Sequence, residues 1–353
     1  MRKRGWMYLI LLVGLELIKY NMVAHYVKDY GTGNIVAYLQ AGDGTSYEHF
    51  KRQESYERLQ PTVLSQKSGT IQGKSQRRVE VIATNGYLPS VQPLSMKNGA
   101  FFSEEAVAQG NNVVVISDVL AESLFGGEEA AGNLCKIEGI YYQVVGVYEK
   151  YKSWTDILLD NGQEKIYLPF RSSVAEEWVV ENLILTPQNE AGEALSIYDL
   201  EDLTVSREEN VVFDFLDRKK TLINGTRLPM AIWGIIGMYR LVKNCGREMQ
   251  KLQGKTTKSV VQSLLKVVLN IGCMWMVYRL TLTGFYISKQ GLPPNNLFDI
   301  SFYVEQFKVK CIQHNYLTQY ALFPFEGIYT FMRNRVMGIG IVEVVCIYKW
   351  RKK

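Results

Sequence analysis

Apolar positions gather near the two ends of the chain, and polar positions fill its middle. One apolar stretch lies at 6–23, and three more lie at 228–242, 267–287 and 336–348. A helix needs roughly 20 residues to cross the ~30 Å hydrocarbon core of a bilayer. The pattern therefore predicts four transmembrane helices, with a large polar domain between the first helix and the second.

Basic residues cluster beside these apolar stretches, at 2–4, 240–258 and 349–353, in a chain of 353 residues with net charge +5. Cytoplasmic loops of membrane proteins carry an excess of Lys and Arg. Four spans place both termini on one side, so all three clusters then face the cytoplasm. This predicts a multi-pass protein of the lipid bilayer with both termini cytoplasmic. The clusters do not form a basic stripe of the kind that binds nucleic acid.

The two patterns together divide the chain into three regions. We expect the first transmembrane helix at 1–24 and an extracytoplasmic domain at 25–225. A three-helix membrane module should follow at 226–353, with a basic cytoplasmic loop at 243–258 and an outer loop at 288–318. The first stretch also has the basic start of a signal peptide. No small-x-small cleavage motif follows it, which favours a retained anchor.

Charged residues interrupt the predicted spans. Glu16 lies in the first span and Arg279 in the third. Glu343 lies in the fourth, which is the weakest and begins either at 336 or as early as Leu317. Charges are costly in hydrocarbon. One explanation is that these charged side chains face other helices or a partner subunit. The other, for Glu16 and Arg279, is that they lie near the membrane–water interface and extend toward water.

Short apolar and alternating runs predict that the polar domain has an α+β fold, a mixed sheet with short helices, inserted after the first of the four transmembrane helices. Ser117 should cap a helix that ends at Gly126. A hairpin over 135–150 should turn near Glu138. Residues 24–78 are polar and show little periodicity. Further strands are expected at 77–84, 112–116, 165–170 and 178–187.

Motifs for catalysis and cofactor binding are missing. The fragments at 73–75 and 254–256 end like a phosphate-binding loop. Neither has the required glycine five positions earlier, and neither follows an apolar strand. The five cysteines form no CxxC pair and the three histidines are scattered. A zinc site, a disulfide framework or a Ser-His-Asp set is therefore not expected, and we predict a chain without a cofactor or enzymatic activity of its own.

Several motifs of the polar domain occur in an order that resembles a known family. A Gly-x-x-Phe turn lies at Gly99–Phe102, VISDVLAESLFG occupies 115–126, Gly132 follows, and VVGV occupies 144–147. VEVIATNGYL precedes them and IYLPF follows them. Over about 79–170 they resemble the extracytoplasmic core domain of MacB/FtsX-like ABC transporter permeases.

The resemblance implies a bacterial cell-membrane permease with one helix, an outer domain and then three helices. A separate cytoplasmic ABC ATPase would move the helices and so reshape the outer domain. Such permeases pair as homodimers or heterodimers. The third and fourth spans depart from this plan, because they lack the Gly/Ala-rich pattern of closely packed membrane helices.

Two functions follow from these patterns. In the first, the chain is the permease subunit of an ABC transporter. In that case Lys243, Arg247, Lys251 and Lys255 of the basic loop either contact the ATPase or only set the topology. The alternative is a non-transporting, membrane-anchored sensor or regulator whose outer domain binds a peptide or an envelope partner. A membrane-anchored enzyme is disfavoured by the missing catalytic motifs.

Overall fold

The computed structural model divides the chain into two compact units by its internal contacts. One unit comprises Met1–Asp29, Arg218–Tyr303 and Tyr329–Lys353, and the other comprises Tyr30–Asp217 and Val304–Ile328. Each unit has its own internal packing. The residues that the structure describes are 11, 14–24, 33–39, 46–92, 94–127, 129–151, 157, 160, 162–189, 191–205, 210–250, 257–281, 292–293, 296–319 and 324–352.

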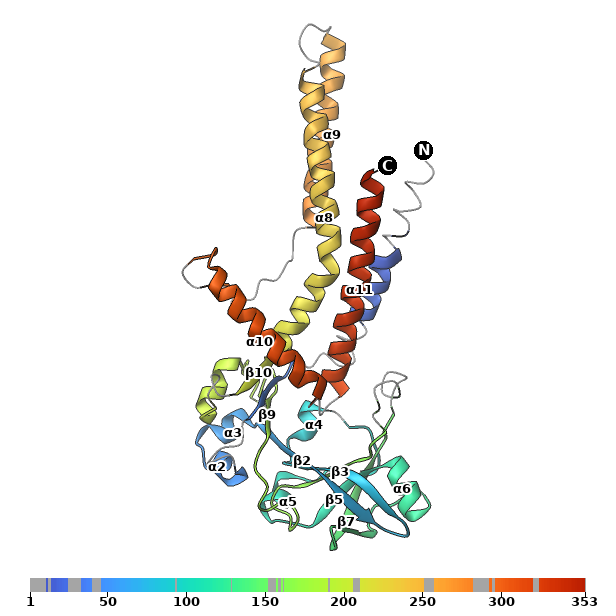
Figure 1. Cartoon of the computed structure of the whole chain (residues 1–353), viewed down its shortest axis with the longest axis vertical. Coiled ribbons are helices and arrows are strands. Elements are labelled where there is room, and N and C mark those ends of the chain that lie inside the picture. Colours follow the sequence, from blue (N-terminus) through green and yellow to red (C-terminus); the bar gives the residue numbers. More distant parts are fainter. Residues whose placement is uncertain are drawn as a thin grey trace. The chain divides into compact units, whose positions relative to one another are not determined.

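The second unit is built on a ten-stranded mixed sheet (Figure 1). The strand order is β10-β1-β9-β2-β3-β8-β5-β7-β4, and β6 pairs with both β2 and β7. The β3/β8 and β5/β7 pairs are parallel and the other pairs are antiparallel. This confirms the expected α+β domain with a mixed sheet. The strands are β1 (Ile35–Tyr38), β2 (Thr62–Gln72), β3 (Gln76–Thr84), β4 (Met96–Gly99), β5 (Val113–Ser117), β6 (Leu134–Ile137), β7 (Ile140–Tyr148), β8 (Lys165–Pro169), β9 (Asn182–Leu185) and β10 (Val211–Asp214).

Strand β2 joins two parts of this sheet. One of its edges pairs with β3 from Leu64 to Gln72. Its other edge pairs with β9 at 62–64 and with β6 at 71–72. Because β6 also pairs with β7, the six strands β2, β3, β8, β5, β7 and β6 form a closed ring of pairings. Fully buried apolar side chains of these strands, such as Ile71, Ile116 and Val144, form the core of the unit.

Short helices connect the strands, and their caps follow from local sequence. The Ser117 side chain accepts a hydrogen bond from the N–H of Leu120 at the start of α6, and Gly126 ends that helix in the left-handed conformation with φ +84°. Both features confirm the prediction. The predicted hairpin is also confirmed, because Glu138 and Gly139 both have positive φ between β6 and β7. These short helices are α2 (Tyr47–Lys51), α3 (Ser55–Leu59), α4 (Leu88–Val91), α5 (Glu104–Ala108), α6 (Asp118–Phe125) and the 3₁₀ helix η1 (Ile197–Leu203).

The Gly-x-x-Phe turn follows β4 for a steric reason. Gly99 has φ +68°, and a Cβ there would collide with the carbonyl oxygen of Val145 in β7. Only glycine fits both the backbone angle and the close approach. Phe102 at the end of the turn is 5% exposed and packs against Phe101, with ring centroids 4.2 Å apart. This motif therefore fixes the β4–β7 pairing.

The C-terminal part of the chain is helical. The predicted span at 228–242 lies within α8 (Phe215–Gln250), most of 267–287 lies within α9 (Thr257–Thr281), and 336–348 lies within α11 (Pro324–Lys352). Residues 14–24 are also helical. Among the described residues, however, no helix combines the length and the apolar character that a membrane crossing needs. The four membrane spans stay a prediction.

Two predicted loops are largely helical. The interval 288–318 contains most of α10 (Ile300–Gln319), which begins where the Asp299 carboxylate accepts hydrogen bonds from the N–H groups of Ser301 and Phe302. The sequence carries this signal, since Asp is a favoured residue at a helix N-cap. In the basic interval 243–258, α8 continues through Gly246 to Gln250, and α9 begins at Thr257.

Candidate functional site: where the strands meet the helices

Strands β1 and β10 lie at one end of the strand order, and β10 leads directly into α8. They pair antiparallel, with Ile35 opposite Asp214. Strand β10 ends at Asp214, and α8 begins at the next residue, Phe215. The N–H of Phe215 donates to the carbonyl oxygen of Asn34 at 2.9 Å, so the sheet hydrogen bonding continues into the first turn of the helix. The start of α8 is therefore joined to the sheet without an intervening linker.

The Asp214 side chain strengthens this connection. Its Oδ1 accepts a hydrogen bond from the N–H of Asp217 at 2.9 Å, which caps the first turn of α8. Asn34 is fully buried, and its side-chain amide donates to the carbonyl oxygen of Val91 in α4 at 3.3 Å. The end of the β1/β10 pair is therefore attached to α4 as well as to α8.

Helix α11 contacts the same pair of strands through a buried hydrogen bond. The hydroxyl of Tyr38 in β1 donates to Oε1 of Glu326 in the first turn of α11 at 2.5 Å. Tyr38 is 5% exposed and Glu326 is 1% exposed. A distance this short is typical of a hydroxyl that donates to a carboxylate, the stronger class of hydrogen bond. The Tyr38 ring also packs edge-on against Phe213 of β10, with centroids 5.4 Å apart.

Helix α10 is held by β10. The side-chain amide of Gln313 donates to the carbonyl oxygen of Val212 at 2.8 Å. Leu317, one turn further along α10, is 2% exposed. The strands β1 and β10 thus hold the starts of α8 and α11 and the middle of α10. We call this set of contacts the strand–helix junction.

The charged residues predicted in the first and fourth spans meet in the other unit. Lys19 lies 3.1 Å from Oε1 of Glu16 and 2.5 Å from Oε2 of Glu343. The side chains of Lys19 and Glu343 are fully buried. Arg279 is not part of this group: its guanidinium is exposed and lies 5.7 Å from the ring centroid of Trp275. The structure brings together two of the three charges that the sequence singled out, and adds Lys19 between them.

The basic loop is described only in part. Lys243 and Arg247 lie in the last two turns of α8 and both are exposed. They are four positions apart and so lie on one face of the helix. Lys251 and Lys255 lie outside the described residues.

The Gly73-Lys74-Ser75 fragment has a structural role that excludes a phosphate cradle. It forms the β2–β3 turn and binds the last carbonyl groups of α6. The N–H of Lys74 donates to the Leu124 carbonyl at 2.9 Å, and its Nζ donates to the Phe125 carbonyl at 2.9 Å. A phosphate site would require the start of a helix, where N–H groups are free. This lysine instead lies at the end of a helix, where cations are favoured.

A cluster of charges surrounds the start of α6. Lys97 lies 2.6 Å from the Asp118 carboxylate, Lys150 lies 2.8 Å from Glu164, and Ser117 donates to Glu164. Burial alone would raise the pKa of Asp118. Hydrogen bonds from Lys97 and from two backbone N–H groups outweigh it and lower that pKa. These contacts connect β4 to α6, and β5 to the segment before β8.

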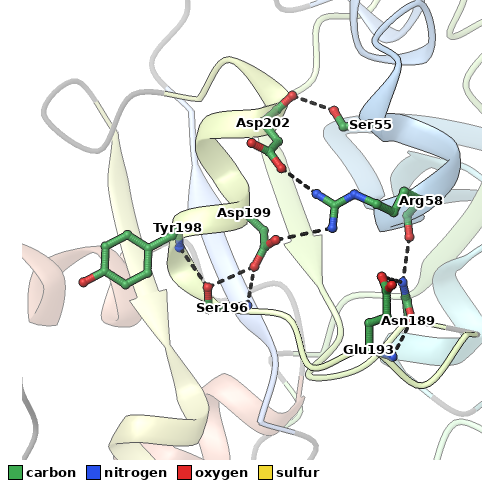
Figure 2. A network of polar contacts seen from close by, with 8 residues as sticks. All are labelled: Ser55, Arg58, Asn189, Glu193, Ser196, Tyr198, Asp199 and Asp202. Atoms are coloured by element: carbon green, nitrogen blue, oxygen red, sulfur yellow. Dashed lines mark hydrogen bonds and ion pairs between the residues drawn. The ribbon is translucent and has the colours of Figure 1, made fainter.

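A network of polar contacts attaches α3 to η1, as Figure 2 shows. The Arg58 guanidinium lies 2.5 Å from the Asp202 carboxylate and 3.6 Å from that of Asp199. Ser196 and Asp199 form a reciprocal cap at the start of η1. Asn189 donates to the Arg58 carbonyl at 3.1 Å. These side chains are partly exposed and pair with one another, so the network is structural.

Metal-binding geometry is absent from the part of the chain that the structure describes. No three His, Cys, Asp or Glu side chains there lie close enough to hold an ion. His49, for example, faces Thr204 Oγ1 at 3.4 Å. The candidate site is the strand–helix junction, where hydrogen bonds join β1 and β10 to the helices.

Comparison with known proteins bears on the whole polar domain. Residues 10–196 match the family model described as the MacB-like periplasmic core domain. The chain belongs to this family. The resemblance found in the sequence is thereby confirmed, and the match extends beyond 79–170 at both ends. The match begins within the first apolar stretch and covers the polar region up to residue 196.

Individual relatives are more distant. The macrolide export ATP-binding/permease protein MacB of Wolinella succinogenes is 30% identical over 75 residues, which is 21% of this chain and only 12% of that protein. The periplasmic region of MacB from Actinobacillus actinomycetemcomitans is 17% identical, with a TM-score of 0.41, and covers 56% of this chain and 96% of its own. The extracellular domain of the ABC-type transporter YknZ from Gram-positive bacteria is 16% identical, with a TM-score of 0.36, over 48% of this chain and 88% of its own.

Proposed function

We propose that the chain is the permease subunit of a MacB-like ABC transporter and couples a separate cytoplasmic ATPase to movement of its outer domain. The observation that supports this most is the strand–helix junction. Strand β10 runs into α8 without a linker, and Tyr38 attaches β1 to α11. Helices that move in the membrane would then pull on two adjacent strands of the outer sheet.

The proposed topology places 1–24, and three segments within 226–353, in the cell membrane of a bacterium, with both termini cytoplasmic. The domain at 25–225 would lie outside. In this arrangement the basic interval 243–258 faces the ATPase. Exposed Lys243 and Arg247, together with Lys251 and Lys255, would contact it. We propose that two permease chains, identical or related, form the working assembly.

Copurification tests the proposal. The full chain, expressed with its cognate ABC ATPase, should retain that ATPase through affinity purification in mild detergent. Replacing the four basic residues of the loop with Ser should abolish retention and leave membrane orientation unchanged. A matched control replaces four cations of the outer domain with Ser and should retain the ATPase. The control residues are Lys51, Arg52, Lys67 and Arg77.

The two explanations of the basic loop give different results. If the four substitutions leave ATPase retention intact, the loop is not the contact. If they invert the membrane orientation, the cations only set the topology. If no ATPase is retained by the natural chain, the permease proposal is wrong, and the sensor or regulator alternative takes its place.

A further inference from the structure

A groove on the outer domain lies between the β2–β3 turn and the edge of β6. It encloses about 580 Å³. Its walls carry two lysines, two carboxamides and three large apolar side chains, and no Asp or Glu is among the described residues that line it. The side chains used below are Lys74, Phe125, Leu134, Lys136 and Tyr141.

Both lysines make contacts that fix their position, and neither forms an ion pair with an Asp or Glu among the residues that the structure describes. Lys74 Nζ donates to the Phe125 carbonyl at 2.9 Å. Lys136 Nζ lies 4.7 Å from the centroid of the Tyr141 ring, a cation–π contact. An ammonium group has three donors, so each lysine keeps donors for a ligand. The groove therefore favours an anionic occupant.

The backbone of β6 offers a free edge in this groove. Strand β6 pairs with β7 over its whole length, but it pairs with β2 only at Lys136 and Ile137, because β2 ends at Gln72. In the two-residue hairpin, Ile137 and Cys135 exchange hydrogen bonds with β7. The N–H and C=O of Leu134 then point to the opposite side. Among the described residues no strand pairs with Leu134 on that side, so its backbone groups are available to an added strand.

Apolar surface lies beside this free edge. Leu134 is 62% exposed and Tyr141 is 60% exposed. Leu134 and Lys136 alternate with the buried Cys135 and Ile137, so they share the outer face of the strand. An extended segment with alternating acidic and apolar residues would meet both kinds of surface at once.

We propose that this groove binds an extended acidic segment of a partner protein, which adds as a short strand to β6 at Leu134 and places its carboxylates on Lys74 and Lys136. Strand addition supplies affinity through the main chain, and the lysines select for acidic side chains. This binding goes beyond the coupling to an ATPase and does not require it. The two proposals therefore fail independently.

A binding titration with a defined peptide tests the electrostatic part. The full chain in nanodiscs of zwitterionic lipid is titrated against a fluorescent ten-residue peptide of alternating Glu and Val, and fluorescence anisotropy gives the Kd. Lys136→Glu should weaken binding at least about tenfold, since one hydrogen bond to a charged group contributes roughly 1.5–3 kcal/mol. Lys74→Glu should act in the same direction.

The matched control is Lys67→Glu, which makes the same charge change at an exposed lysine of β2 outside the groove and should alter the Kd less than about twofold. A peptide of alternating Lys and Val should not bind the natural chain. Equal weakening by Lys67→Glu and Lys136→Glu, or equal binding of the Lys peptide, would overturn the proposal.

A backbone substitution tests the strand addition. Leu134→Pro removes an N–H that the β6–β7 ladder does not use, so the hairpin should fold, as Pro is tolerated on an edge. Peptide binding should be lost in Leu134→Pro and largely kept in Leu134→Ala. Unchanged binding in Leu134→Pro would show that the peptide does not add to β6. Crosslinking of the groove to a second copy of this chain, in place of the peptide, would also refute the proposed occupant.

Discussion

Removal of the Tyr38 hydroxyl tests how the sheet is attached to α11. Tyr38→Phe keeps the ring and its edge-on contact with Phe213 but removes the donor to Glu326. Both side chains are at least 95% buried, so water cannot replace the lost bond easily. A hydrogen bond to a charged group contributes about 1.5–3 kcal/mol. The free energy of opening the strand–helix junction should fall by that amount, which corresponds to a roughly 10- to 150-fold change in the opening equilibrium.

Amide hydrogen exchange measured by mass spectrometry on the full chain in detergent reports this opening directly. Peptides covering 33–39 and 210–217 should lose protection by roughly 10- to 150-fold in Tyr38→Phe. Peptides from the closed ring, such as 113–127, should keep their protection, because the pairing of β5 with β7 and β8 is untouched. The control Tyr141→Phe removes an exposed hydroxyl of the same residue type and should leave both sets unchanged. Unaltered protection at 33–39 in Tyr38→Phe would refute the attachment, and a uniform loss over all peptides would show a global effect instead.

Three further substitutions test the fold and the charged groups. Gly99→Ala should lower the free energy of unfolding by at least ~2 kcal/mol through its positive φ and the collision with the β7 backbone, whereas Gly127→Ala, with open space around it, should be nearly neutral in a urea titration. The pKa of Asp118 is lowered in the folded state, so its contribution to stability is present above the unfolded pKa and is lost as pH falls through the folded pKa. Asp118→Asn should therefore be less stable than the natural chain at pH 7, and the two stabilities should converge near pH 2. Lys19→Met should lower thermal stability in detergent by the equivalent of about 3–5 kcal/mol, because Glu343 would stay buried without its cation. The double variant with Glu343→Leu should recover most of this loss. Equal stability of the single and double variants would contradict the buried pair.

Elements with strong local patterns could be predicted from sequence. Strand β5, helix α6 and the β6–β7 hairpin each have an apolar run bounded by a cap or a turn. Strand β2 could not be predicted, although it is the longest strand. It is buried on both faces at 62–65, polar from 66 to 70 and paired with three different strands, so no single period describes it.

The strand–helix junction was also beyond sequence reasoning. Tyr38 and Glu326 are 288 positions apart, and neither lies in a motif. The pairing of Lys19 with Glu343 spans 324 positions. The sequence did identify Glu16 and Glu343 as unusual, because charges in apolar stretches are rare. It could not show that Lys19, one turn from Glu16, pairs with both of them. Long-range contacts of this kind depend on the assembled fold.

We propose that a separate ATPase drives movement of the outer domain through its attached helices. The most direct measurement places one spin label at exposed Gln109 of the outer domain and one at exposed Gln262 of α9, in a chain whose five native cysteines are replaced. Pulsed EPR then gives the label distance in nanodiscs that contain the chain and its ATPase. We expect ATP with orthovanadate to shift the distance distribution, and to have no effect without the ATPase. An unchanged distribution in the trapped complex would contradict the coupling.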